Sequence, residues 1–245
     1  MVHTPRHCEA PAELLARRSR WTDRLKKVLE GKRPDDWATK RAKQLLRPIL
    51  YELAHGKCVY CEGALDVTSD SHIEHYISRA VDPDQAFDWM NLLPGCSKCN
   101  IAKGAQDHGN LLLKPDIEDP EPYFWMHPDT GELQPHPSLD SAAAARARRT
   151  IELCKLQRPA LCSERLRMLG RAVRWLTQLA AASEMTAHLH DEWQELSDPR
   201  MTYKFVLRHA LTLRGQAALA QQDRLSFEDK RRVYRSLAVN IKPAR

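Results

Sequence analysis

The chain has 245 residues, of which 42% are hydrophobic, so it is long enough for one elaborated domain or a small core with helical additions. No apolar run approaches the roughly 20 residues that span a bilayer, and no apolar signal segment opens the sequence. Cysteines at metal-binding spacing, without an export signal, favour a reducing compartment over a disulfide framework. We therefore expect a cytoplasmic protein.

The net charge of +6 is unevenly distributed along the chain. Residues 1–55 hold 13 Lys and Arg against 7 Asp and Glu, residues 56–140 hold 5 against 15, and residues 141–245 hold 20 against 10. Because an acidic middle segment repels phosphate, the basic flanks should supply most of the attraction to nucleic acid. The best candidates for phosphate contacts are Arg146, Arg148, Arg149, Lys230, Arg231 and Arg232. Runs of basic residues more often mark a solvated face, which is the alternative here.

The N-terminal region, residues 1–55, is predicted to be helical. Residues 13–17 and 42–46 have helical composition without glycine. Gly31 and Pro34 separate these two helices, and the second one leads toward the first cysteine pair.

Two cysteine pairs follow, Cys58 with Cys61 and Cys96 with Cys99. Two thiolates at this spacing can reach one ion from a tight turn, and two such turns complete a tetrahedral shell. Since four protein ligands leave no open position, the spacing predicts a structural Zn²⁺ rather than four buried thiols that happen to be paired. The isolated Cys8, Cys154 and Cys162 are expected to be small buried side chains on helices.

The segment between the pairs is long enough to hold its own substructure. Residues 71–77 alternate in polarity and contain β-branched side chains, as a short strand does, and residues 100–103 are expected to begin a helix. The predicted order is therefore turn, strand, loop, turn, helix. The polar residues along it are Glu74, His75, Asn91, Asn100 and Lys103.

This arrangement resembles an HNH nuclease of the ββα-metal type, with Cys-x-x-Cys, Glu-His, Asn-Leu and Cys-x-x-Cys-Asn-x-x-Lys in order. His75, Asn91 and Asn100 fall on the three motif positions. Asn100 replaces the last histidine, and Glu74 stands where many members have aspartate. The resemblance covers roughly residues 50–170. Within the superfamily the sequence is most similar to the PtuB subfamily of Septu and retron-associated antiphage systems. The segments that carry this similarity are residues 56–62, 73–75, 89–93, 110–115 with 119–120, and 149–153.

The resemblance implies a metal-dependent endonuclease that hydrolyses phosphodiester bonds, with DNA favoured over RNA. His75 would deprotonate water, because an unperturbed imidazole accepts a proton near neutral pH. Glu74 and Asn100 would hold Mg²⁺ or Mn²⁺ through oxygen atoms. Asn91 would bond the backbone of the loop after His75 and orient its ring. Lys103 would contact a phosphate, with a solvated lysine as an equal alternative.

The sequence contains no Gly-rich phosphate loop beside these motifs, so the chain has no evident means of using ATP. The resemblance then implies a separate SMC-like or ABC-like ATPase partner, similar to PtuA. A noncatalytic zinc-containing adaptor that binds nucleic acid or a partner is the alternative. Retention of Glu74, His75, Asn91 and Asn100 argues against it.

His72 competes with His75 for a role in the chemistry, since it lies three residues earlier. On an alternating strand an odd separation places two side chains on opposite faces. We therefore expect His72 to have a surface or packing role. Asp66, Asp70 and His108 are expected to be solvated loop residues.

The remaining chain divides at the end of a proline-rich stretch, residues 116–138, which is predicted to be a partly extended crossover with a hairpin turn at residues 129–131. Residues 139–245 are predicted to be helical, with one apolar face along Leu166, Leu169, Val173, Leu176 and Leu179. The helices are expected at 141–156, after Pro159, and around 187–197, 201–221 and 227–239. The sequence thus predicts an α+β, predominantly α protein in which helical regions 1–55 and 139–245 flank a zinc-stapled nuclease core at 56–115.

Overall fold

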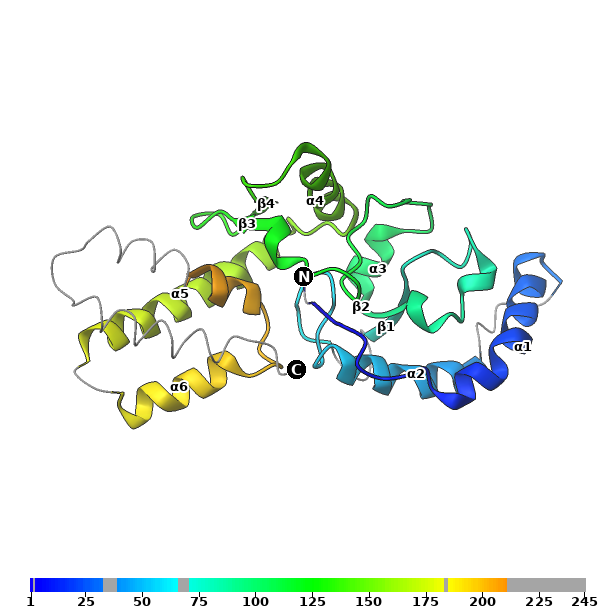
Figure 1. Cartoon of the computed structure of the whole chain (residues 1–245), viewed down its shortest axis with the longest axis horizontal. Helices are drawn as coiled ribbons and strands as arrows, with labels where there is room; N and C mark the ends of the chain where they lie inside the picture. The colour runs from blue at the N-terminus through cyan, green and yellow to red at the C-terminus, as the bar shows by residue number, and fades with distance from the viewer. Residues whose placement is uncertain (2, 33–38, 66–70, 183–184, 211–245) are drawn as a thin grey trace. The chain divides into compact units, whose positions relative to one another are not determined.

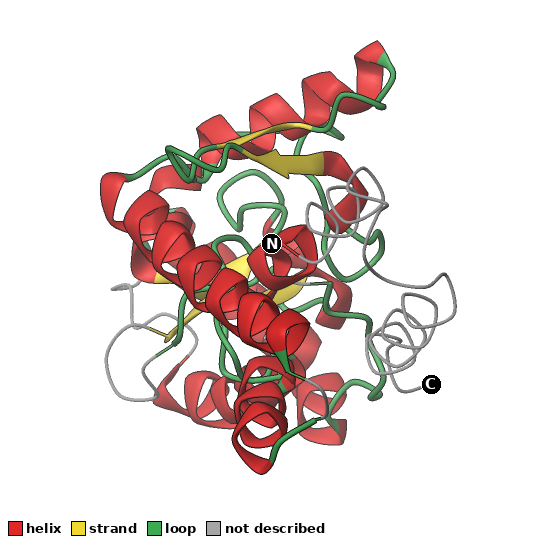
Figure 2. Cartoon of the chain, turned by 90° about the vertical axis from the view of Figure 1, so that its left-hand side faces the viewer, coloured by secondary structure: helices red, strands yellow, loops and turns green. Residues whose placement is uncertain are grey.

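A computed structural model describes residue 1 and residues 3–32, 39–65, 71–182 and 185–210 (Figure 1). These residues are mostly helical with two small antiparallel sheets, in agreement with the predicted α+β class (Figure 2). No helix within them is long and apolar enough to cross a membrane. In chain order the elements are α1 (Ala12–Leu29), α2 (Thr39–Leu53), β1 (Ser71–His75), β2 (Leu92–Cys96), α3 (Ser97–Lys103), β3 (Phe124–Met126), β4 (Leu133–Pro135), α4 (Ser141–Leu153), α5 (Pro159–Ala181) and α6 (Ala187–Ser197).

The predicted N-terminal helices are α1 and α2, and both pack into one hydrophobic core with the first sheet. Leu46 and Leu50, one helical turn apart on α2, are fully buried beside Ile73 of β1 and Leu92 of β2. Each buried leucine contributes roughly 1.5–3 kcal/mol through removal of apolar surface from water. This packing fixes α2 against the strand that holds His75.

The first sheet pairs β1 with β2 in antiparallel register, with His72 opposite Gly95 and Glu74 opposite Leu93. β1 ends at His75, two residues earlier than predicted, because the next amides bond elsewhere. The Tyr76 amide donates to the Asn91 carbonyl and the Ile77 amide donates to the Asn91 side chain. The sheet therefore ends where the site begins.

Helix α3 begins at Ser97, three residues before the predicted start. The Cys96 thiol caps it by accepting a hydrogen bond from the Cys99 amide at 3.4 Å. The second cysteine pair thus lies at the junction of β2 and α3.

The second sheet confirms the hairpin predicted in the crossover, since β3 pairs with β4 in antiparallel register. Gly131 in the connecting turn has φ +71°, and a Cβ there would lie 2.4 Å from the Cys162 carbonyl oxygen. Only glycine fits this backbone conformation and this close approach. Phe124 is buried and α4 packs beside β4.

Two compact units divide the chain, Met1–Glu164 and Arg165–Arg245. In the second unit Trp175 stacks on Trp193 of α6 at 4.9 Å between ring centroids. The predicted apolar face of α5 is wrong: its five residues are only partly buried, whereas Met168, Ala172 and Trp175 are buried. Of the helix predicted at 201–221, residues 204–210 are helical. The helix predicted at 227–239 lies outside the described residues.

Candidate functional site

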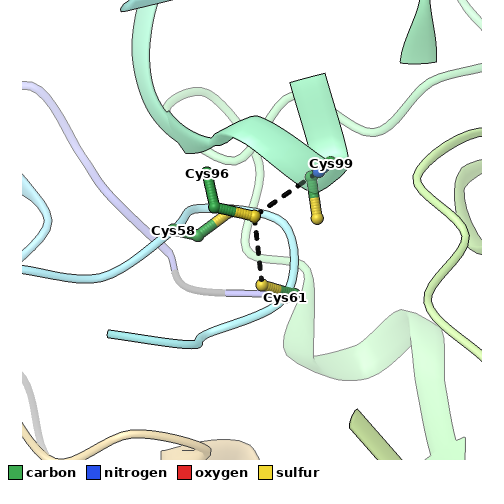
Figure 3. Close-up of side chains that lie close together, drawn as sticks. All are labelled: Cys58, Cys61, Cys96 and Cys99. Atoms are coloured by element: carbon green, nitrogen blue, oxygen red, sulfur yellow. Dashed lines mark hydrogen bonds between the residues drawn. The ribbon is translucent and has the colours of Figure 1, made fainter. Parts of the chain in front are cut away.

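The four motif cysteines converge on one point (Figure 3). Their sulfur atoms lie within 4.8 Å of one another, and the Cys61 and Cys96 sulfurs are 3.9 Å apart. The first pair sits on a tight turn in which the Cys58 amide donates to the Gly63 carbonyl and the Glu62 amide donates to the Cys58 carbonyl. The second pair comes from the β2–α3 junction.

This cluster suits a tetrahedral cation. Metal–sulfur bonds of about 2.3 Å place the sulfur atoms of a tetrahedral site about 3.8 Å apart. The guanidinium of Arg158 donates a hydrogen bond to the Cys99 sulfur at 3.3 Å, which offsets negative charge on a thiolate. Burial raises the pKa of Cys58 well above that of a free thiol, so a bound cation must displace protons. The four residues can therefore hold one metal ion.

Of the other cysteines, Cys154 and Cys162 are buried as predicted. The prediction for Cys8 is wrong, because its side chain is exposed and lies before α1.

A pocket of about 430 Å³ lies beside the metal cluster's hairpin, between β1, α3 and α2. His72, His75 and Asn100 all line it. His72 therefore lines the same pocket as His75, although the alternation of the strand predicted opposite faces, and Ile73 between them lines it too. A hydrogen bond of 3.0 Å joins His72 Nδ1 to Asn100 Nδ2, so His72 contacts a predicted site residue directly.

His75 is a buried residue whose Nε2 lies 3.0 Å from the Ala86 carbonyl oxygen. A carbonyl only accepts, so Nε2 carries the proton and the lone pair of the neutral ring lies on Nδ1. The pKa of His75 is lowered to about 4, chiefly by burial, which the Ala86 hydrogen bond opposes, and also by the nearby charges of Arg79 and Lys103. The ring is thus neutral at neutral pH, and it is a weaker base than a free imidazole.

Glu74 and Lys103 form a buried ion pair beneath His75. The Lys103 ammonium lies 2.9 Å from Glu74 Oε1, and it also donates to the carbonyls of His75 and Tyr76 at 2.8 and 3.2 Å. Lys103 is only 3% exposed, so the solvated alternative is wrong. The three N–H donors of its ammonium group are already bonded to the Glu74 carboxylate and the two backbone carbonyls. A contact between Lys103 and a phosphate therefore stays a prediction.

The Glu74 carboxylate is fully buried and accepts a second hydrogen bond from the Tyr60 hydroxyl at 3.3 Å. Burial raises the pKa of Glu74 to about 7, and Lys103 and Tyr60 limit the rise. Glu74 Oε2 is buried without a hydrogen-bond partner among the described residues. Glu74 is not among the described residues that line the pocket with Asn100, so a cation shared by these two residues stays a prediction.

Asn91 holds the loop that follows His75. Its Oδ1 accepts from the Ile77 amide at 2.7 Å, and its Nδ2 donates to the carbonyls of Ile77 and Gln85, both at 2.9 Å. Its own carbonyl accepts from the Tyr76 amide. The side chain therefore ties the end of β1 to the segment before β2.

The arginine and lysine residues predicted to contact phosphate lie in several different surroundings. Arg146 forms a bidentate ion pair with Glu118, Arg149 lies 3.5 Å from Glu152, and Arg148 is exposed. The run at 230–232 lies outside the described residues, as do Asp66 and Asp70. His108 is partly buried and donates from Nε2 to the Lys103 carbonyl at 2.9 Å, rather than being solvated.

Sequence reasoning missed the three further basic residues that line the pocket, Lys43, Arg47 and Arg79. The spacing of four between Lys43 and Arg47 does place them on one face of a helix. Only the tertiary structure shows that α2 lies against β1.

Comparison with known proteins agrees with this geometry. Residues 58–106 match the family described as HNH endonuclease. Septu protein PtuB of Bacillus thuringiensis is 34% identical over 86 residues, covering 34% of each chain, and Septu protein PtuB of Bacillus mycoides (strain KBAB4) is 25% identical over 154 residues, covering 50% of each. The chain thus spans between a third and a half of the length of these relatives. The predicted resemblance to an HNH endonuclease of the PtuB subfamily is therefore confirmed.

Proposed function

We propose that this protein is a metal-dependent endonuclease that hydrolyses the phosphodiester bonds of nucleic acid, with DNA favoured. The observation that carries the proposal is the convergence of a neutral His75, with its lone pair on Nδ1, and Asn100 on one pocket beside a four-cysteine cluster. The β1–β2 hairpin and α3 would then be the ββα-metal core, and Zn²⁺ in the cysteine cluster would hold it together.

Each residue has a separate task. His75 would take the proton of the attacking water at Nδ1, while the Ala86 carbonyl holds its Nε2 proton. Glu74 and Asn100 would hold Mg²⁺ or Mn²⁺, which when bound stabilises negative charge on the reacting phosphate. Asn91 would keep the loop after His75 in place. Lys103 would hold Glu74 in an ionised state ready for the cation.

The similarity to Septu proteins PtuB supports a role in antiphage defence. In that role the nuclease would act with a separate SMC-like or ABC-like ATPase, since residues 1–245 contain no Gly-rich phosphate loop. A reducing cytoplasm would suit the four thiolates.

The test compares cleavage of plasmid DNA and of cellular RNA by the wild type and by His75→Ala, each with Mg²⁺, alone and with the ATPase that co-purifies from the host. Cleavage should vanish in His75→Ala while zinc content and thermal unfolding stay unchanged. His190→Ala, which removes an exposed histidine of α6, should cut as the wild type does. Absence of cutting by the wild type under all of these conditions would favour a noncatalytic adaptor.

A further inference from the structure

The pocket beside His75 has a charge opposite to that of its surroundings. Residues 56–140 hold 15 acidic against 5 basic side chains, yet no Asp or Glu is among the described residues that line the pocket. Lys43, Arg47, Arg79 and Lys103 do line it. Besides Lys103, which pairs with Glu74, three basic side chains therefore line the same pocket as His75.

Two of these cations come from α2. Lys43 and Arg47 are one turn apart on the same helical face. Leu46 and Leu50, each three residues after one of these cations and thus on the neighbouring face of α2, anchor the helix in the core next to Ile73 of β1. Both basic side chains are therefore held on a packed helix rather than on a loop.

Arg47 has an unmet hydrogen-bonding requirement. Its Nε is buried and has no hydrogen-bond partner among the described residues. Buried donors in folded proteins are almost always paired, so an acceptor other than the described residues, a water or a ligand oxygen, is expected there. The guanidinium fork matches the geometry of a phosphate group and binds it bidentately.

We propose that Lys43 and Arg47, together with Arg79, form a phosphate-binding wall that holds the nucleic-acid backbone in front of His75. This inference rests on the proposed nuclease function and assigns its substrate contacts to α2, which lies outside the matched residues 58–106. The wall also places the basic charge of residues 1–55 at the reaction site.

The test measures binding of a labelled DNA duplex to the His75→Ala protein over a range of salt concentrations. Lys43→Gln and Arg47→Gln should each raise Kd by about five- to tenfold near 0.1 M salt and lower the slope of log Kd against log salt by about one. Arg47→Lys keeps the charge and should retain most of the slope. The matched control is Lys155→Gln, which removes one exposed lysine outside the pocket and should change neither quantity.

The outcomes separate this inference from the proposed function. If the wild type cuts nucleic acid but the α2 variants bind like Lys155→Gln, the wall is wrong and the nuclease stands. If the α2 variants weaken binding but the wild type cuts nothing, the wall stands and the nuclease is wrong. Unchanged zinc content and thermal unfolding in Arg47→Lys and Lys43→Gln show that a loss of binding is not a loss of fold.

Discussion

Lys103 is the residue on which the Glu-His pair depends. Its ammonium group donates to the Glu74 carboxylate and to the carbonyls of His75 and Tyr76. One interaction fixes a side chain, and the other two fix the backbone at the end of β1. Because this ion pair is withdrawn from water, removing one partner leaves an uncompensated buried charge.

Lys103→Met should lower the free energy of unfolding by about 3–5 kcal/mol, measured by urea titration without Mg²⁺. Lys98→Met, at an exposed position of the same helix, should stay within about 0.5 kcal/mol of the wild type. The double variant Glu74→Gln, Lys103→Met should lose less than the sum of its single variants. Strictly additive losses would contradict the pairing.

Asn91 should be equally intolerant of change. Asn91→Ala loses three hydrogen bonds to backbone groups and should be destabilised by about 2–4 kcal/mol. Asn91→Asp should cost at least as much, because a carboxylate oxygen would face the carbonyls of Ile77 and Gln85. Thermal unfolding measures the loss of stability of both variants. Wild-type stability of Asn91→Asp would contradict the assigned orientation of the amide.

At the scale of elements, the cysteine cluster joins a turn, a strand end and a helix. Residues 58–63 form the turn, and Cys96 both ends β2 and caps α3. A cation bound to the four sulfurs would therefore fasten the hairpin that presents His75 to the helix that presents Asn100. This arrangement makes the metal a structural rather than a reacting component.

Cys58→Ser should lose bound zinc and the protection of backbone amides in residues 58–106. Zinc binding to small structural sites is worth about 10–16 kcal/mol, more than most domains gain from folding. Metal analysis and hydrogen exchange measure the two effects. Cys8→Ser, at an exposed cysteine, should keep both, and retention of full protection by Cys58→Ser would contradict a structural metal.

A second link, between α4 and the crossover, should respond to pH. Burial alone would raise the pKa of Glu118, but hydrogen bonds from Arg146 more than offset this, so its pKa lies below the ordinary value of about 4.5. A carboxyl with a lowered pKa stabilises the fold above its unfolded pKa, and the effect is lost as the pH falls through the folded pKa.

Glu118→Gln should accordingly lower stability by about 1 kcal/mol near pH 7 and by less as the pH falls below about 4. Urea titrations of both proteins at a series of pH values measure the difference. A deficit that stays constant down to low pH would show that the ion pair with Arg146 is not its source.

At the scale of the whole molecule, the chain divides into two compact units. The second is organised by the stacked rings of Trp175 and Trp193, with the Trp175 indole donating to the Leu189 carbonyl at 2.9 Å. The predicted division of the chain at residues 55, 115 and 138 stays a proposal.

Trp175→Ala should destabilise the second unit by about 3–5 kcal/mol, because it empties a buried ring site. Near-ultraviolet circular dichroism reports the loss of ring packing, and zinc content reports the state of the first unit. Arg174→Ala, at an exposed neighbouring position, should change neither signal. Release of zinc by Trp175→Ala would mean that the two units unfold together.

The sequence by itself determined the family and the elements around the site. Spacing of two residues between cysteines and the Glu-His, Asn and Asn positions are local patterns, so they could be read without coordinates. The helices and the 129–131 hairpin turn also follow from local composition.

Only the tertiary structure decided what faces the pocket. The apolar face of α5 was misplaced because its sequence is apolar around more than one side, and burial depends on the partner surface. His72 lines the same pocket as His75 although the two are three residues apart on β1, and Lys103 proved buried because Glu74 lies within its reach. Lys43 and Arg47 reach the pocket because the fold packs α2 against β1. Packing between segments so far apart in the sequence cannot be predicted from a local pattern.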